Sequence, residues 1–324
     1  MAFYRLHGVT LATDVPLRAL LPPGRPPADV TFILAEVAPW PAAVWSAARC
    51  VGGAPPHTAL WQSGAALCLR EPGVADAYIG TDTIVYHPST PASQAVIELR
   101  LLGPLLSLWL DRRGVANLHA AAVVLAGRAH MFLATNGGGK SSLAAGLVAA
   151  GASLLSDDLV ALSPTAPVQI APGSPQLRFW PDTGDHFFGD HRSFPLVHPN
   201  YTKRWVTFGR DWGRWSASPA PLAAIYLPER AGPGEQSETR LAQLPPRAAV
   251  LALIRHTFSA RFLPTDLQAD RLAFFTQLVG EIPILRLHYP GGYDRLPIVA
   301  QALLRSAEGA TRPHEGEPAR ETAG

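Results

Sequence analysis

The sequence predicts an α/β (α+β) fold, in which a mixed core of strands and helices follows a small β-rich domain. Two observations predict this division. Up to about residue 90, short strand-like runs alternate with Pro/Gly turns. Beyond that point, apolar runs alternate with segments of helical spacing, and a glycine-rich loop stands between a strand and a helix. With 324 residues, 48% of them apolar, the chain is long enough for two domains.

The β-rich N-terminal domain is predicted to span residues 1–91. A Pro88-Ser89-Thr90-Pro91 turn closes it. Its strands are expected at Tyr4 to Leu11, Asp29 to Val37, Thr58 to Gln62, Ala66 to Arg70 and Thr83 to Tyr86.

The second domain is predicted to span residues 92–306. It opens with a helix from Ala92 to Arg113 that the Gly103-Pro104 pair should kink. The later elements are expected in this order: an antiparallel hairpin of Leu118 to Leu125 with Ala129 to Ala134, a helix from Lys140 to Ala150 ended by Gly151, a strand from Ala152 to Leu155, a strand from Leu222 to Leu227, helices at about Arg247 to Thr257 and Leu267 to Gly280, a strand from Ile284 to Tyr289, and a helix from Asp294 to Ser306. Residues 307–324 are charged and poor in large apolar groups, which predicts a disordered tail.

Composition excludes several classes of function. The net charge is +2, and no basic block is dense enough to neutralise a run of phosphates, which argues against a nucleic-acid partner. Cys50 and Cys68 lack the spacing of metal ligands and are expected to be ordinary thiols. The N-terminus lacks the apolar run of a signal peptide, and charges and a Gly-Pro pair break the longest apolar run, so we expect no membrane partner and a cytoplasmic protein.

The glycine-rich loop is the strongest functional signal. It reads Asn136-Gly137-Gly138-Gly139-Lys140-Ser141-Ser142 and approximates G-x-x-x-x-G-K-[ST], the Walker A pattern, with Ala134 in place of the first glycine. Glycines let backbone N–H groups converge on a phosphate chain, the lysine supplies a mobile cation for the outer phosphates, and Ser141 offers a hydroxyl to Mg²⁺. The loop predicts an ATP site in which all seven residues contact the nucleotide; the alternative is a glycine-rich turn with an incidental lysine and serine.

The acid pair Asp157-Asp158 is the second signal. It is predicted to lie at the C-terminal end of a buried strand, where α/β sheets place their ligands. Two adjacent carboxylates there can divide the work of phosphoryl transfer, one binding the metal and the other accepting a proton from an attacking hydroxyl. The alternative is a carboxylate pair that caps a turn.

Further side chains are weaker candidates. His119 opens a strand, where a lone histidine is more often structural than functional. The sequence leaves open which cation assists transfer: Arg178, Lys203, Arg204 or Arg261. An aromatic cluster is expected to pack in the core in preference to lining a substrate surface; its members are Phe179, Trp180, Phe187, Phe188, Trp205, Trp212 and Trp215.

The order of these motifs resembles the catalytic domain of HPr kinase/phosphorylase. The resemblance is specific over residues 117–162, where Leu118-His119, the glycine loop and Asp157-Asp158 follow in the same order at similar spacing, and loose over 95–306. It implies a P-loop fold related to phosphoenolpyruvate carboxykinase, in which Lys140 and Ser141 contact nucleotide and metal, Asp157 is the base and His119 lies close to it. The Glu-Arg-Gly signature of the true HPr enzymes is missing after the acid pair. The β-rich start, the helix before Leu118-His119 and the Pro-Gly-x-Pro-like step before Leu177-Arg178-Phe179-Trp180 are more similar to HPr-kinase-related enzymes that tailor ribosomal peptides (RiPPs), among them the lasso-peptide kinases.

Together these signals predict an ATP- and Mg²⁺-dependent phosphotransferase with an alcohol group as acceptor. Asp157, His119 and Lys140 are the predicted catalytic residues, and Ser141 and Asp158 the predicted metal ligands. The acceptor is expected to be a Ser of a peptide or small protein, with the C-terminal Ser of a lasso precursor peptide as the sharpest hypothesis. Two alternatives stay open: a kinase of a small molecule such as free serine, and a nucleotide-gated peptide-binding module without kinase activity. The sequence decides neither the preferred phosphate donor nor whether the chain forms a homo-oligomer.

Overall fold

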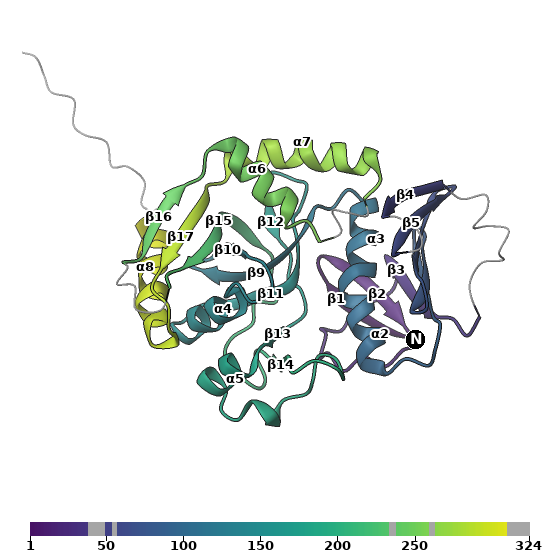
Figure 1. The fold of residues 1–324 in the computed structure, drawn as a ribbon, viewed down its shortest axis with the longest axis horizontal. Helices are drawn as coiled ribbons and strands as arrows, with labels where there is room; N and C mark the ends of the chain where they lie inside the picture. The colour runs from purple at the N-terminus through teal and green to yellow at the C-terminus, as the bar shows by residue number, and fades with distance from the viewer. Residues whose placement is uncertain (38–48, 54–56, 233–237, 259–262, 310–324) are drawn as a thin grey trace, which may run out of the picture.

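The protein is built on two large β-sheets with helices packed against them (Figure 1). The computed structural model describes residues 1–37, 49–53, 57–232, 238–258 and 263–309. The fold is therefore mixed α/β, as predicted. The boundary at residue 91 stays a prediction, and most of the tail expected at 307–324 lies outside the described residues.

The N-terminal sheet has eight strands in the order β1-β2-β3-β8-β7-β6-β5-β4. Most neighbours are antiparallel, but β3 runs parallel to both β2 and β8. The strands are β1 (Ala2–Leu6), β2 (Val9–Thr13), β3 (Val30–Leu34), β4 (Arg49–Gly53), β5 (Ala59–Ser63), β6 (Ala66–Glu71), β7 (Ala75–Ile79) and β8 (Thr83–Pro88).

One predicted strand is a hairpin. The run Tyr4 to Leu11 was expected to be continuous, but the chain reverses at His7 and Gly8, which both have positive φ (52° and 83°). Two such residues form the two-residue turn that matches the twist of antiparallel strands. The expectation was wrong because a histidine in the left-handed region gives no turn signal of its own.

A broken helix covers one face of the N-terminal sheet. It consists of α2 (Gln94–Arg100), a wider turn η1 (Leu101–Leu105) and α3 (Leu106–Arg112). Gly103 leaves helical dihedrals (φ −117°, ψ −107°) just before Pro104, so the predicted kink is confirmed. Apolar side chains of this helix, among them Leu105 and Trp109, share one core with the sheet.

The C-terminal sheet is mixed and has seven strands in the order β11-β9-β10-β15-β17-β16, with β12 paired to β15. The predicted hairpin of β9 and β10 is confirmed, while β10, β15 and β17 run parallel. The strands are β9 (Asn117–Leu125), β10 (Arg128–Leu133), β11 (Ser153–Ala161), β12 (Gln169–Ile170), β15 (Ala220–Arg230), β16 (Arg240–Gln243) and β17 (Ile284–Tyr289).

Helices cover both faces of the C-terminal sheet. Because successive strand residues point to opposite faces, Ala121 and Val123 of β9 pack with α4 and α8, whereas Ala120 and Ala122 pack with α6 and α7. The helices are α4 (Lys140–Ala149), α6 (Pro246–Arg255), α7 (Thr265–Glu281) and α8 (Leu296–Gly309), with the short turn η4 (Tyr293–Arg295) before α8. All four helices were expected, and Gly151 (φ 109°) follows α4 as predicted.

A separate hairpin lies below the C-terminal sheet in Figure 1. It pairs β13 (Gln176–Phe179) with β14 (Arg204–Thr207), and the chain between them forms α5 (Pro181–Phe187) and the turn η2 (His191–Ser193). The sequence predicted none of these four elements, nor β4, β7, β12 and β16.

The acid pair does not end its strand. Strand β11 continues through Asp157 and Asp158 to Ala161, paired antiparallel with β9 along its length. The prediction of a strand end at Leu155 was wrong because this strand is antiparallel, so partner hydrogen bonds carry it across the polar pair. Asp158 has a φ of 71°, a conformation that aspartate tolerates better than most residues.

Two other expectations concern single features. Cys50 and Cys68 are both free thiols, and Cys68 is buried. Within the described residues, no helix is long and apolar enough to cross a membrane.

Candidate functional site

The glycine-rich loop connects β10 to α4, as the sequence predicted. Gly137 and Gly139 have φ of 78° and 88°, in the left-handed region that favours glycine. Gly138 needs its missing side chain for a different reason, since a Cβ there would lie 2.7 Å from the Cβ of Ala134. The alanine that replaces the first glycine of the pattern thus packs directly under the loop.

The loop presents unbonded backbone donors at the start of α4. Gly139 is the N-cap, and no side chain caps the helix. The first backbone bond of α4 runs from the Leu143 N–H to the Gly139 carbonyl at 2.9 Å, so the N–H groups of Lys140, Ser141 and Ser142 precede it. Together with the helix dipole, these N–H groups form an arrangement suited to an anion.

Lys140 places a mostly buried ammonium under the loop. Its Nζ donates to the carbonyls of Ala134 at 2.6 Å and Thr135 at 3.4 Å. Burial lowers the pKa of Lys140, an effect that Asp157 and Asp158 oppose. Among the described residues, the Lys140 ammonium has hydrogen bonds to carbonyl oxygens and no ion pair, so it is well placed to attract phosphate oxygens.

The two serines after the lysine differ in their partners. Ser142 Oγ lies 2.9 Å from Thr183 Oγ1, which lies 3.0 Å from the Tyr293 hydroxyl. These two hydrogen bonds connect α4 to α5 and η4. The Ser141 hydroxyl makes no hydrogen bond to the described residues, so it is the one available to a ligand.

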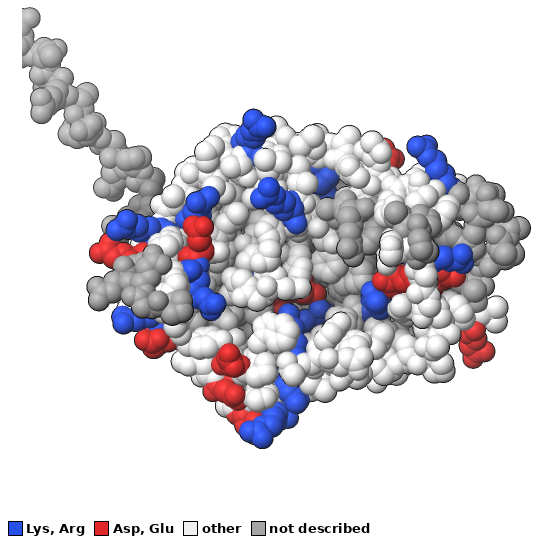
Figure 2. Space-filling view, in the orientation of Figure 1, with Lys and Arg blue, Asp and Glu red and all other residues white. Residues whose placement is uncertain are grey.

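The acid pair faces the loop across one pocket. The pocket is lined by His119, Thr135, Asn136, Gly137, Gly138, Gly139, Lys140, Ser141, Ser142, Asp157, Asp158, Trp180 and Lys203. Adjacent strand residues would normally point to opposite faces, and the left-handed backbone of Asp158 is what allows both carboxylates to line it. Figure 2 shows basic (blue) and acidic (red) side chains side by side in the middle of the face of the molecule that it draws.

The two carboxylates have different surroundings. Asp157 Oδ2 accepts a 2.8 Å hydrogen bond from the backbone N–H of Arg178. Burial raises the pKa of Asp157, although Lys203 lowers it in part. Burial would also raise the pKa of Asp158, but the Arg178 guanidinium, which binds its Oδ2, and then His119 bring that pKa below its usual value.

His119 lies beside the acid pair, as expected. Its Nε2 is 3.4 Å from Asp158 Oδ1, and its ring lies 5.6 Å from that of Phe258. Burial lowers the pKa of His119 to about 4, despite the nearby Asp158 carboxylate. The ring is therefore neutral near pH 7, so that it can share a proton with a carboxylate without adding charge.

The structure separates the four candidate cations. Lys203 lines the pocket, with its Nζ 6.0 Å from the centre of the Trp180 ring. Arg178 holds the acid pair, whereas Arg204 donates to the carbonyl of Phe194. Arg261 lies outside the described residues. No local sequence pattern signals the contact of Arg178 with both acids, because that contact depends on the pairing of β13 with β14, which was not foreseen.

The aromatic cluster is chiefly core, as expected. Phe179 is buried, and Phe187, Phe188, Trp212 and Trp215 pack around the same core. Trp180 is the exception, because it is 45% exposed and lines the pocket. Trp205 lies in a different place, under the Arg18 guanidinium.

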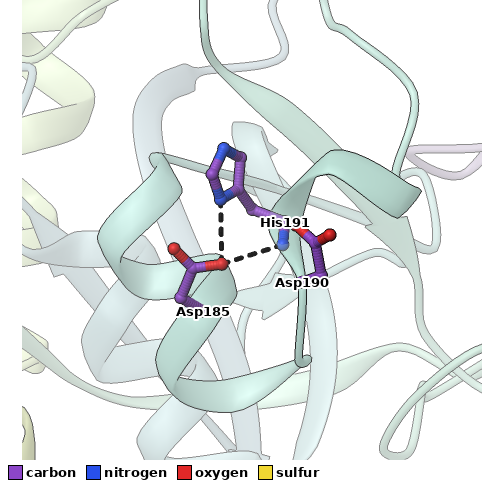
Figure 3. Close-up of side chains that lie close together, drawn as sticks. All are labelled: Asp185, Asp190 and His191. Carbon is purple, nitrogen blue, oxygen red and sulfur yellow. Dashed lines mark hydrogen bonds and ion pairs between the residues drawn. The ribbon is translucent and has the colours of Figure 1, made fainter.

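A second polar cluster, of Asp185, Asp190 and His191, lies at the surface on α5 and the turn that follows it (Figure 3). Asp185 Oδ1 accepts from the backbone N–H of His191 at 2.9 Å and faces its Nδ1 at 2.8 Å. Asp190 caps the next turn through the N–H of Arg192. Both carboxylates are exposed and used by local turns, which accounts for the cluster without a metal.

Comparison with known proteins finds a structural neighbour. No protein-family model matches the sequence, and no curated protein matches it. Among solved structures, the chain is similar to one described as "Structure of the Hpr(Ser) kinase/phosphatase from Coxiella burnetii", at 12% identity and a TM-score of 0.31, covering 60% of this chain and 97% of that one. A match at this TM-score decides nothing about the roles of individual residues.

Proposed function

We propose that this chain is an ATP- and Mg²⁺-dependent kinase that transfers a phosphoryl group to a hydroxyl. The observation that carries the proposal is that one pocket joins the uncapped, glycine-lined start of α4 to a pair of half-buried carboxylates. The first half suits a phosphate chain, and the second suits the removal of a hydroxyl proton.

ATP would bind through the loop. In this proposal residues 136–142 form a P-loop whose N–H groups contact the phosphates, and Lys140 turns from the Ala134 carbonyl to the outer phosphates. Lys203 would balance the charge of the transferred group, because it is the candidate cation that lines the pocket without an ion pair to a described residue.

The donor set fits Mg²⁺, which prefers oxygen ligands. Ser141 offers an unbonded hydroxyl, and the lowered pKa of Asp158 keeps its carboxylate ionised at neutral pH. These two residues would hold the ion, which when bound would neutralise phosphate charge. Arg178 and His119 would keep Asp158 oriented toward it.

Asp157 is the proposed base. In the step, the acceptor oxygen forms a bond to the γ-phosphorus, the bond to the β,γ-bridging oxygen breaks and ADP leaves, while the acceptor proton moves to Asp157. Its raised pKa makes the ionised carboxylate a stronger proton acceptor than an exposed aspartate. The neutral His119 would help to position Asp158 without adding charge.

For the acceptor we propose a Ser hydroxyl of a peptide, with the C-terminal Ser of a lasso precursor peptide as the sharpest candidate. The support is the β-rich start, the helix before Leu118-His119 and the step before Leu177-Arg178-Phe179-Trp180, which resemble the kinases of peptide-tailoring clusters. The boundary at residue 91, the cytoplasmic location and the absence of nucleic-acid partners stay predictions.

Mass spectrometry of candidate acceptors after incubation with Mg·ATP tests the proposal. We expect a gain of one phosphate on Ser-containing peptides with the wild-type protein and none with Lys140→Ala. Phosphate on free serine and not on peptides would instead identify a small-molecule kinase. ATP-dependent peptide binding with no phosphate on any product would identify a binding module.

A further inference from the structure

A second, smaller pocket lies between the broken helix α2–η1 and the β13–β14 hairpin. It is next to the pocket that joins the glycine loop to the acid pair, which the proposed function makes the phosphate pocket. Its walls come from the loop after β2, from α2 and η1, and from the β13–β14 hairpin. They comprise Arg18, Glu98, Leu99, Leu102, Gln176, Arg178, Val197 and Trp205. We infer that this pocket binds a carboxylate of the acceptor, an inference that rests on the proposed kinase function.

The pocket is rich in donors that the protein does not use. Arg178 uses one guanidinium nitrogen on Asp158, and its other two make no hydrogen bond to the described residues. Gln176 is only 7% exposed, and its Nε2 has no hydrogen-bond partner among the described residues. An unpaired buried donor costs about 1–3 kcal/mol, which a ligand acceptor atom would relieve.

The acceptors in the wall are already occupied. Glu98 Oε2 accepts from the backbone N–H of Arg18 at 2.8 Å and from its Nε at 3.3 Å, and Glu98 Oε1 accepts from the Ala19 N–H at 2.7 Å. Glu98 therefore fixes Arg18 in place and neutralises one charge. The Arg18 Nη1 donates to the Leu196 carbonyl at 3.1 Å, and its guanidinium lies over the Trp205 ring. The Glu98 oxygens are thus taken, whereas the buried atom of this wall that has no partner among the described residues is a donor, Gln176 Nε2.

Arg178 connects this pocket to the chemistry. Its guanidinium lines the second pocket and binds Asp158, which lines the first. Trp180 and Lys203 in the first pocket lie two residues along the hairpin from Arg178 and Trp205 in the second, a spacing of about 7 Å in a strand. One acceptor can thus place a hydroxyl near Asp157 and a carboxylate beside Arg178.

A carboxylate fits these donors better than a neutral group. It accepts several hydrogen bonds on two oxygens and interacts with arginine through two parallel N–H groups. The carboxylate could be the C-terminus of a peptide or an acidic side chain next to the phosphorylated residue, so the test separates these two sources.

The test measures binding without transfer. Three fluorescein-labelled peptides are titrated by fluorescence polarisation in the presence of the β,γ-imido analogue of ATP: Ala-Ala-Ser with a free C-terminus, the same peptide as its amide, and Ala-Ser-Asp amide. We expect at least one carboxylate peptide to bind about tenfold or more tightly than the neutral amide. The peptide that does so identifies the source of the carboxylate.

Gln176→Glu places a negative charge in the pocket and should reduce that ratio to near one, whereas Gln176→Leu should reduce it partly. Gln243→Glu is the matched control, since Gln243 is exposed on the edge strand β16. Melting curves and binding of the ATP analogue check that the variants fold, and Gln176→Leu keeps the test valid if the buried glutamate prevents folding. Equal affinities for all three peptides, no binding of any of them, or an unchanged ratio in a folded Gln176 variant would overturn the inference.

A parallel reaction with ATP separates this result from the proposed function. Carboxylate-dependent binding without phosphate on any acceptor would leave the pocket assignment standing and reject the kinase. Phosphorylation of all three peptides with equal KM would do the reverse.

Discussion

The two sides of the phosphate pocket are built in opposite ways. The loop side, residues 135–142, is continuous in sequence and presents backbone N–H groups and one lysine. The acid side combines His119 of β9, the Asp157-Asp158 pair of β11 and Arg178 of β13, which are joined by side-chain contacts. If the proposed function holds, this difference assigns nucleotide binding and proton removal to separate structural units, each of which can be altered alone.

The largest expected effect comes from the acid side. Asp157→Asn keeps the shape of the side chain but cannot accept the hydroxyl proton as readily, and loss of a general base typically costs about 10² to 10⁴-fold in turnover, or roughly 3 to 5.5 kcal/mol. ATP affinity should change much less, because the loop makes the phosphate contacts. Single-turnover phosphorylation beside nucleotide titration measures both quantities.

Asp158→Asn is the control for this change. It should raise the Mg²⁺ concentration needed for activity, since the proposed metal ligand loses its charge. If Asp157→Asn keeps near wild-type turnover while Asp158→Asn abolishes it, the two roles are reversed. If both variants stay active, the base lies elsewhere.

The next effect belongs to the loop side. Mg·ATP at a hundred times its dissociation constant should stabilise the fold by about 2.7 kcal/mol, a shift of several degrees in Tm. Lys140→Ala should remove most of this shift, because it deletes the cation under the loop. Lys203→Ala is the matched control and should keep more of the shift. An unchanged Tm shift in Lys140→Ala would reject this phosphate site.

The same contrast explains what the sequence could predict. Local patterns predicted the β9–β10 hairpin, the glycine loop, α4 and the kink at Gly103, because turn residues and helical spacing act over a few positions. They failed where distant segments meet. The continuation of β11 past Asp158 depends on pairing with β9, and the contact of Arg178 with the acid pair depends on the β13–β14 hairpin. The pocket of Arg18 and Gln176 was hidden for the same reason.

A third change probes the loop geometry itself. Gly137→Ala and Gly139→Ala both force an alanine into the left-handed region, at a cost of about 1–2 kcal/mol. A Cβ at Gly137 meets open space, whereas one at Gly139 would lie 2.7 Å from the Tyr289 hydroxyl. We expect Gly139→Ala to lose about 1–3 kcal/mol more in urea unfolding. Equal losses in the two variants would show that the packing of Tyr289 does not restrain the loop.

The smallest effect concerns how His119, on the acid side, makes the stability of the fold depend on pH. Burial lowers the pKa of His119 from an ordinary value near 6.5 to about 4, so the unfolded state binds more protons between these values. The stability that the neutral ring contributes is fully present above pH 6.5 and is lost as pH falls through about 4. In the middle of this window the unfolding free energy changes by at most about 1 kcal/mol per pH unit, an upper limit because the side chain is 30% exposed. His119→Gln, which cannot be protonated, should reduce the slope of the unfolding free energy against pH by this amount and also lower turnover.

His130 is the matched control. Burial also lowers its pKa to about 4, but it lies outside the pocket, beside Tyr226. His130→Gln should flatten the same curve and leave turnover per folded molecule unchanged. If neither variant alters the slope between pH 6.5 and 4, these rings do not stay neutral in the folded protein. If both lower turnover equally, His119 has no special part on the acid side.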